Sequence, residues 1–183
     1  MNFNNFTIKA QEVIEASILL AQKKGQQVIE PAHIMRSMGD KGEQVLHYIF
    51  GKLDVNTTTI LNACDAMIDH LPKVSGGEPY FSNEVNLIFM KAIALSEKDK
   101  DEFVSLEYLL LDLLVEKSTV QKLLKDAGIT EKGLRMVIES LRKGNKVNSQ
   151  NAEESYQALS KYAIDLNEQA RSGKLDPVIG RDE

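Results

Sequence analysis

The sequence has too few cysteines to cross-link the chain and no long apolar run that could span a membrane. It has one cysteine, Cys64, and no tryptophan in 183 residues. A single cysteine cannot form an intrachain disulfide, which fits a reducing compartment. No apolar run approaches the roughly 18 residues that a membrane span needs, and the polar start lacks the layout of a secretory signal. These absences favour a cytoplasmic protein without a membrane partner.

Positive charge is not in excess either. Lysine and arginine total 22 against 27 acidic residues, so the formal net charge is −5. A protein that holds a phosphate backbone needs a basic surface, and we therefore expect no nucleic-acid partner. The composition is 43% hydrophobic and 27% charged, which is usual for a globular domain with its own core.

The sequence also lacks the motifs of nucleotide chemistry. A phosphate-binding loop reads G-x-x-x-x-G-K-[ST], with glycines that free backbone N–H groups and a lysine after them. Gly51-Lys52 continues into leucine, and so does Gly173-Lys174. We therefore predict no nucleotide cofactor bound by this sequence.

Metal and nucleophile patterns are equally sparse. No two histidines have the H-x-x-x-H spacing that places two ligands on one helical face. Cys64 lies at helical spacing from Ile60 and Met67, which is typical of a small buried hydrophobe. The alternative, a cysteine–histidine nucleophilic pair, has no supporting pattern. We predict no catalytic residue and no metal site.

Helical periodicity dominates the first half of the chain. Apolar residues at i, i+3, i+4 and i+7 predict helices over residues 8–24, 31–38, 42–50 and 56–70. Thr7 stands where an N-cap belongs, and Gly25 where a glycine commonly follows a helix end. Residues 71–79 hold two prolines and two glycines, which predicts a loop.

The same apolar pattern returns 75 positions later. Ile14 pairs with Phe89 and Ile29 with Val104, and with one residue deleted the match continues beyond residue 129. Four helices in one order at nearly one offset indicate an internal duplication. We predict an all-α fold: a compact eight-helix domain of two quasi-equivalent four-helix repeats, residues 6–71 and 81–144, with a groove at their seam.

The character of the sequence changes after residue 144. Residues 145–153 are polar and without apolar periodicity, which predicts a linker. Residues 154–183 should form an extra helix to about residue 171 and a lead-in segment. An apolar stripe on that helix either packs back on the domain or awaits a partner: Tyr156, Leu159, Tyr162, Ala163 and Leu166.

Several stretches resemble a known family. Phe6-Thr7 with Ile29-Glu30-Pro31 resembles the first half of the duplicated N-terminal domain of Clp ATPases, and residues 103–110 (FVSLEYLL) resemble the second half. Residues 174–183 (KLDPVIGRDE) are similar to the entry into the first ATPase module of ClpB-type disaggregases. The resemblance covers the whole chain.

The resemblance implies a substrate-docking domain of an ATP-dependent protein disaggregase. The parent would be an AAA+ homohexamer that uses ATP and Mg²⁺, cooperates with a DnaK-type chaperone system and threads polypeptide through its ring. This domain would capture unfolded or aggregated client proteins and hydrolyse nothing itself. The alternative is an adaptor-docking or regulatory module of a Clp ATPase that works with a protease; an enzyme is the third possibility.

The resemblance also implies binding residues, in a shallow apolar groove with a polar rim. Lys100 stands where the family usually has glycine, and a lysine is strained in a left-handed cap, which leaves the end of the helix before it open. Thr7 could instead serve only as an N-cap, and two of the apolar positions could belong to the core. The tyrosine is expected to be partly exposed. The matching rim positions are Thr7, Asp101 and Glu107, and the apolar positions are Phe89, Leu95 and Tyr108.

Overall fold

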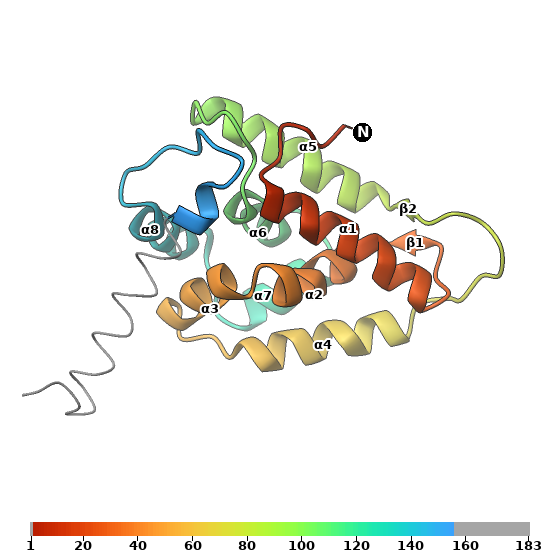
Figure 1. Cartoon of the computed structure of the whole chain (residues 1–183). Helices are drawn as coiled ribbons and strands as arrows, with labels where there is room; N and C mark the ends of the chain where they lie inside the picture. Colours follow the sequence, from red (N-terminus) through yellow and green to blue (C-terminus); the bar gives the residue numbers. More distant parts are fainter. Residues whose placement is uncertain (1, 156–183) are drawn as a thin grey trace, which may run out of the picture.

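The computed structural model describes residues 2–155, so the predicted apolar stripe and the lead-in over residues 156–183 lie outside the described residues. The described part is mostly helical, as predicted, with two short strands (Figure 1). The elements in order are α1 (Ile8–Lys23), β1 (Val28–Ile29), α2 (Pro31–Lys41), α3 (Glu43–Lys52), α4 (Thr57–Asp69), β2 (Tyr80–Phe81), α5 (Asn83–Lys98), α6 (Leu106–Val115), α7 (Thr119–Asp126) and α8 (Glu131–Arg142).

Helix ends follow local chemistry where the sequence signals were strong. The Thr7 hydroxyl accepts the N–H of Ala10 at the start of α1, and Thr130 caps α8 in the same way. Helix α2 instead continues one turn past its predicted end, through Gly39. A Cβ on Gly39 would lie 2.5 Å from Leu61 Cδ1. This glycine therefore allows α4 to approach α2 closely and does not end the helix.

The two repeats exchange their lead-in strands. Phe6 of the first repeat forms a parallel bridge with Val104 of the second. At the equivalent place, Phe81 of the second repeat pairs with Ile29 of the first, in the parallel pair β1–β2. Likewise α3 packs against α8 while α4 packs against α7. The predicted duplication is confirmed, and the exchange makes the two repeats one folded unit.

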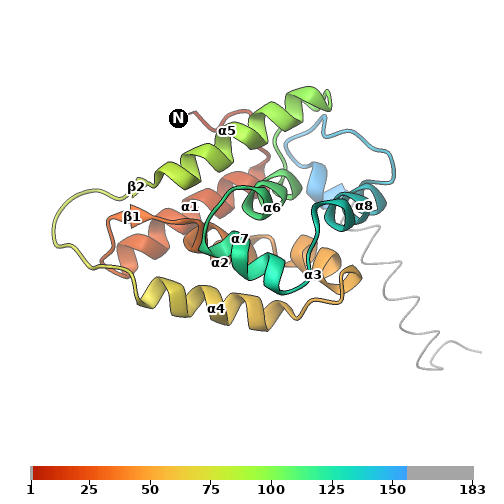
Figure 2. The same cartoon turned by 180° about the vertical axis from the view of Figure 1, so that it is seen from behind.

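Helix α6 lies at the centre of the fold. It contacts α2, α5, α7 and α8 (Figure 2), and every residue from Leu106 to Leu114 is buried. This stretch includes two acids, Glu107 and Asp112. Charged groups are rarely buried without partners. Glu107 and Asp112 therefore mark the places in the interior where polar or charged contacts are expected. Among residues 2–155, no helix is both long enough and apolar enough to cross a membrane.

Residues 146–153, which composition predicted as a linker, pack on the domain. Val147 and Glu153 are fully buried. The N–H of Val147 donates to Asp101 Oδ1 at 3.0 Å, and the carbonyl of Gln150 accepts the N–H of Ile8 at 2.9 Å. In Figure 1 this blue segment passes from α8 to the end of α5 and back to the start of α1. The linker prediction was wrong here, because polar residues bond to protein as readily as to water.

Candidate functional site

Arg142, the last residue of α8, gathers the side chains of the second repeat. Its Nη1 donates to Asp101 Oδ2 at 2.8 Å, and its Nη2 to Glu107 Oε2 at 2.7 Å and to Ser105 Oγ at 2.9 Å. Its guanidinium carbon lies 4.8 Å from the ring centre of Tyr108. The Tyr108 hydroxyl in turn donates to Asp101. We call these five residues the Arg142 cluster.

The Arg142 cluster is a largely buried ion-pair network. Burial alone would raise the pKa of Asp101, but hydrogen bonds from Tyr108, Val147 and Arg142 hold it below its usual value. Burial, together with the bond to Asp101, raises the pKa of the Tyr108 hydroxyl. Burial works against the Arg142 charge, yet the carboxylate of Glu107 raises the pKa of Arg142 overall. All three groups therefore keep their ordinary charge state at neutral pH.

Thr7 joins the same region through Glu153. Its hydroxyl donates to Glu153 Oε1, which also accepts the N–H of Leu106 at the start of α6, at 3.2 Å. Glu153 Oε2 is buried without a hydrogen-bond partner. Burial, and after it the charge of Glu107, raise the pKa of Glu153. Thr7 is thus both the predicted N-cap and an anchor for the segment after α8.

Phe89 does not line a surface groove. It is fully buried, and its ring lies edge-on to Phe3, Phe6 and Phe81 with centroids 5.3, 6.1 and 5.1 Å away. Such T-shaped contacts are typical of aromatic cores. The alternative that Phe89 serves the core is confirmed. Leu95 is half-buried against the same core and keeps some exposure.

The expectations for the rim and for Tyr108 were also wrong. Asp101, Glu107 and Tyr108 are all buried, because Arg142 draws the two carboxylates inward and the ring packs under its guanidinium. The structure therefore brings together Thr7, Asp101, Glu107 and Tyr108, but around the domain's own partners. Phe89 and Leu95 lie apart from this network.

A pocket of about 550 Å³ opens beside the Arg142 cluster. It lies between α6 and α8, within the second repeat, and not at the seam where a groove was expected. Three acids and three bases contribute to its wall, so it offers no single charge to a ligand: Asp99, Glu107, Glu139, Arg135, Arg142 and Lys146. In the described part of the chain, no group of three or more His, Cys, Asp or Glu side chains could hold a metal ion.

Cys64 and His33 have structural surroundings. Cys64 is fully buried, and burial raises the pKa of its thiol to about 12, so it behaves as the predicted small hydrophobe. His33 Nδ1 accepts the N–H of Glu30 at 2.9 Å, and its Nε2 therefore donates to Gln26 Oε1 at 2.8 Å. Both side chains belong to the packing of the first repeat.

Two residues of the network were not predicted from the sequence, Arg142 and Glu153. For Arg142 a signal existed, because the repeat alignment places it opposite Ile68, a fully buried position in the first repeat. A cation at a core position of a duplicated fold predicts buried acids nearby. For Glu153, inside a polar segment, the sequence offered no comparable sign.

The outer face of α5 carries exposed apolar side chains. Leu87 is 41% exposed and Met90 58% exposed. The repeat alignment places them opposite Glu12 and Glu15 on α1. The fold therefore does not require apolar residues there, and this difference between the repeats marks a candidate binding surface. We call Leu87 and Met90 the α5 face.

The family of this chain follows from a comparison with protein-family models. The Clp repeat (R) N-terminal domain matches residues 5–127 and again residues 81–180. The chain belongs to this family. The second match begins at residue 81, where the second repeat of this Clp N-terminal domain begins.

Relatives at the sequence level are chaperones. The chain is 58% identical over 183 residues to the chaperone protein ClpB of Bacteroides thetaiotaomicron, and 48% identical over 183 residues to that of Porphyromonas gingivalis. Each match covers 100% of this chain and 21% of the relative. This Clp N-terminal domain therefore spans about a fifth of the length of the curated relatives it matches.

Solved structures support the fold. The Hsp104 N-terminal domain from Candida albicans superposes with a TM-score of 0.73 at 19% identity, over 82% of this chain and 99% of that one. The N-terminal domain of the ClpD chaperone from Arabidopsis thaliana gives 0.60 at 18% identity, over 79% and 98%. At these identities the likeness establishes the Clp N-domain architecture alone.

Proposed function

We propose that this domain docks unfolded or aggregated client polypeptides for a ClpB-type disaggregase. The observation that carries the proposal is the α5 face, where Leu87 and Met90 are exposed while the equivalent residues of α1 are glutamates. Unfolded chains expose apolar side chains that folded proteins hide, so an apolar surface recognises them without a sequence rule. The half-buried Leu95, further along α5, packs against the core and is not part of this face.

The proposal extends to the parent protein through the relatives. The parent would be a cytoplasmic AAA+ hexamer that uses ATP and Mg²⁺ and works with a DnaK-type system. Within these 183 residues no phosphate-binding loop occurs, so nucleotide hydrolysis falls to the rest of the parent. Docking by one domain should be weak, because the client loses chain entropy. Six tethered domains around a ring would raise the effective concentration without any new contact.

The test is a titration of this chain with unfolded casein, followed by NMR or fluorescence. Wild-type chain should give saturable shifts on α5, and the double change Leu87→Glu/Met90→Glu should weaken binding at least tenfold. That change copies the α1 pattern onto an exposed surface, so the fold should be preserved, as circular dichroism would check. Unchanged binding by the double variant would contradict the proposal.

Leu19 on α1 is the matched control. It is 63% exposed, so Leu19→Glu replaces an exposed apolar side chain by a negative charge on the other repeat, as each half of the double change does on α5. Client binding should survive this change if α5 is the docking surface. If the wild-type chain shows no binding to casein, the adaptor-docking alternative is favoured.

A further inference from the structure

We call residues 146–153 the strap, and its first residues, 146–148, bind the domain as an extended peptide would. Val147 is fully buried. Its N–H donates to Asp101 Oδ1 at 3.0 Å, and its carbonyl accepts the N–H groups of Glu102 at 2.9 Å and Phe103 at 3.3 Å. Three of the strap's contacts thus come from the backbone of one residue. Any extended chain with an apolar residue at this point could make them.

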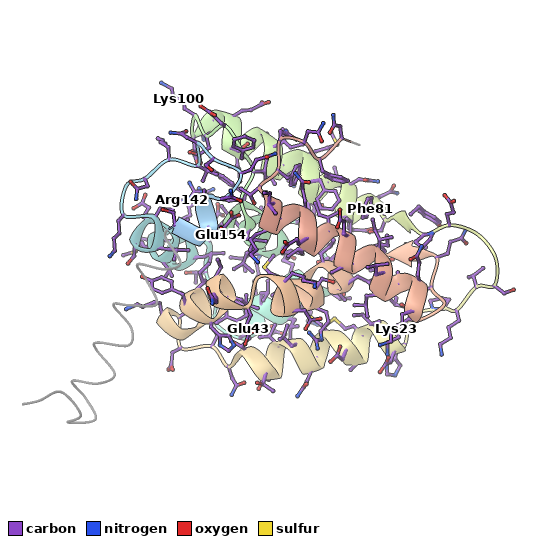
Figure 3. All side chains as sticks on the ribbon, in the orientation of Figure 1. Lys23, Glu43, Phe81, Lys100, Arg142 and Glu154 are labelled. Carbon is purple, nitrogen blue, oxygen red and sulfur yellow. The ribbon has the colours of Figure 1, made fainter. Side chains whose placement is uncertain are left out.

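The flanking contacts add a preference for charge. Lys146 Nζ donates to the carbonyl of Asp99 at 2.7 Å, at the end of α5. Asp101 lies beside it, bound to Arg142 on its other oxygen. The strap therefore presents a basic residue followed by an apolar one to this end of the domain. Figure 3 shows Lys100, Arg142 and Glu154 around the same end.

The far end of the strap is bonded to the domain but leaves one buried oxygen without a partner. Glu153 Oε1 has two donors, the Thr7 hydroxyl and the Leu106 N–H. Its Oε2 has none and is buried. A buried carboxylate oxygen without a donor weakens the interaction that holds it. The strap is thus held along its length by Lys146, Val147, Gln150 and Glu153, and its release would relieve the unfavourable contact at Glu153 Oε2.

We propose that the strap occupies a second client-docking site, for extended segments in which a basic residue precedes an apolar one, and that such a segment displaces it. The inference rests on the proposed function. Thr7 and Asp101, which the strap covers, would become accessible when it leaves. The site would then offer a pocket for one apolar side chain, backbone donors from residues 102 and 103, and a carbonyl for a cation.

The strap site and the α5 face are within reach of one client. Met90 and Asp99 are nine residues apart on and just after α5, which is about 14 Å along the axis at 1.5 Å per residue. Four or five extended residues span that distance. A client segment could therefore contact Met90 and still reach the place of Val147.

The experiment uses a labelled peptide that copies residues 144–153 and the variant Val147→Asp, which should release the strap. Fluorescence anisotropy should show that the peptide binds the variant at least tenfold more tightly than wild type, where the strap blocks the site. A control peptide with aspartate at the valine position should not bind. Unfolded casein should displace the bound peptide. Amide exchange at Glu102 and Phe103 reports whether the strap has left.

Several results would overturn the inference: equal peptide binding to variant and wild type, no displacement by casein, or persistent protection of the two amides. If Val147→Asp does not fold, the same experiment is done with Glu153→Ala and Lys146→Glu, which should release the strap from its two ends. Failure of the proposed function is distinguishable. In that case casein binds neither wild type nor variant, whereas failure of the strap inference alone leaves casein binding intact and sensitive to Leu87→Glu/Met90→Glu.

Discussion

His33 and Tyr108 stand at the same position of the two repeats, 75 residues apart, and each bonds the residue that follows a left-handed helix cap. His33 Nε2 donates to Gln26 Oε1 at 2.8 Å, and the Tyr108 hydroxyl donates to Asp101. The first pair is neutral and the second contains a carboxylate. The second repeat therefore needs a cation, and Arg142 supplies it where the first repeat has Ile68. The two repeats thus share one backbone arrangement but differ in the charge of the side chains that they bury.

The left-handed cap before Asp101 is a source of strain. Lys100 has φ 61° and its counterpart Gly25 has φ 68°, so the helix ends alike in both repeats despite the lysine. Lys100→Gly should stabilise the domain by about 0.5–1 kcal/mol, because relief of the steric cost exceeds the entropy that glycine adds to the unfolded chain. Urea unfolding measures this.

Gly25→Ala is the matched control for that change. An added Cβ at Gly25 would meet no atom within 4 Å, so only backbone strain acts. It should destabilise the domain by about 1 kcal/mol. Opposite signs for the two variants are the expected result, and a loss of stability in Lys100→Gly would contradict the strain.

Arg142 should be among the most sensitive positions in the domain. Arg142→Ala leaves the buried carboxylates of Asp101 and Glu107 without their cation, and breaking such a pair costs about 3–5 kcal/mol. The control is Arg135→Ala on the same helix, whose exposed partner Glu131 lies 3.1 Å away. An exposed pair contributes about 0–1 kcal/mol. Similar losses in the two variants, measured by thermal unfolding, would show that the cluster does not stabilise the fold.

The sequence predicted what depends on local pattern. Apolar periodicity and capping residues predicted the helices, because both depend on neighbours three and four positions apart. The return of that pattern 75 positions later predicted the duplication. The burial of Glu107 depends on Arg142, 35 residues away, and the burial of Thr7 depends on Glu153, 146 residues away. A surface acid and a buried acid look alike in sequence until the distant partner is known. The structure therefore places Thr7, Asp101, Glu107 and Tyr108 close together but more buried than expected, and their role in binding stays a prediction.

His33 should make stability fall in acid. Burial lowers the pKa of His33 from 6.5 to about 4. Between pH 4 and pH 6.5 the side chain is therefore protonated in the unfolded chain and neutral in the folded domain. The contribution is complete above pH 6.5 and is lost as pH falls through about 4, with a size on the order of 3 kcal/mol. The free energy of unfolding of His33→Gln should depend less on pH over this range than that of wild type. Equal slopes would show that His33 is protonated in the folded domain.

Asp112 should act in the opposite direction. It is buried on α6 with Oδ2 unpartnered, and burial raises its pKa from 3.8 to about 7 despite the opposing charges of Lys91 and Arg135. The folded domain then holds a proton that the unfolded chain has lost. This contribution is complete below pH 3.8 and disappears as pH rises through about 7. Asp112→Asn removes the ionisation while keeping the shape, so the variant should gain on the order of 4 kcal/mol relative to wild type between pH 4 and pH 8. A constant difference between the two proteins over that range would mean that Asp112 is ionised in the folded domain, with a donor supplied to Oδ2.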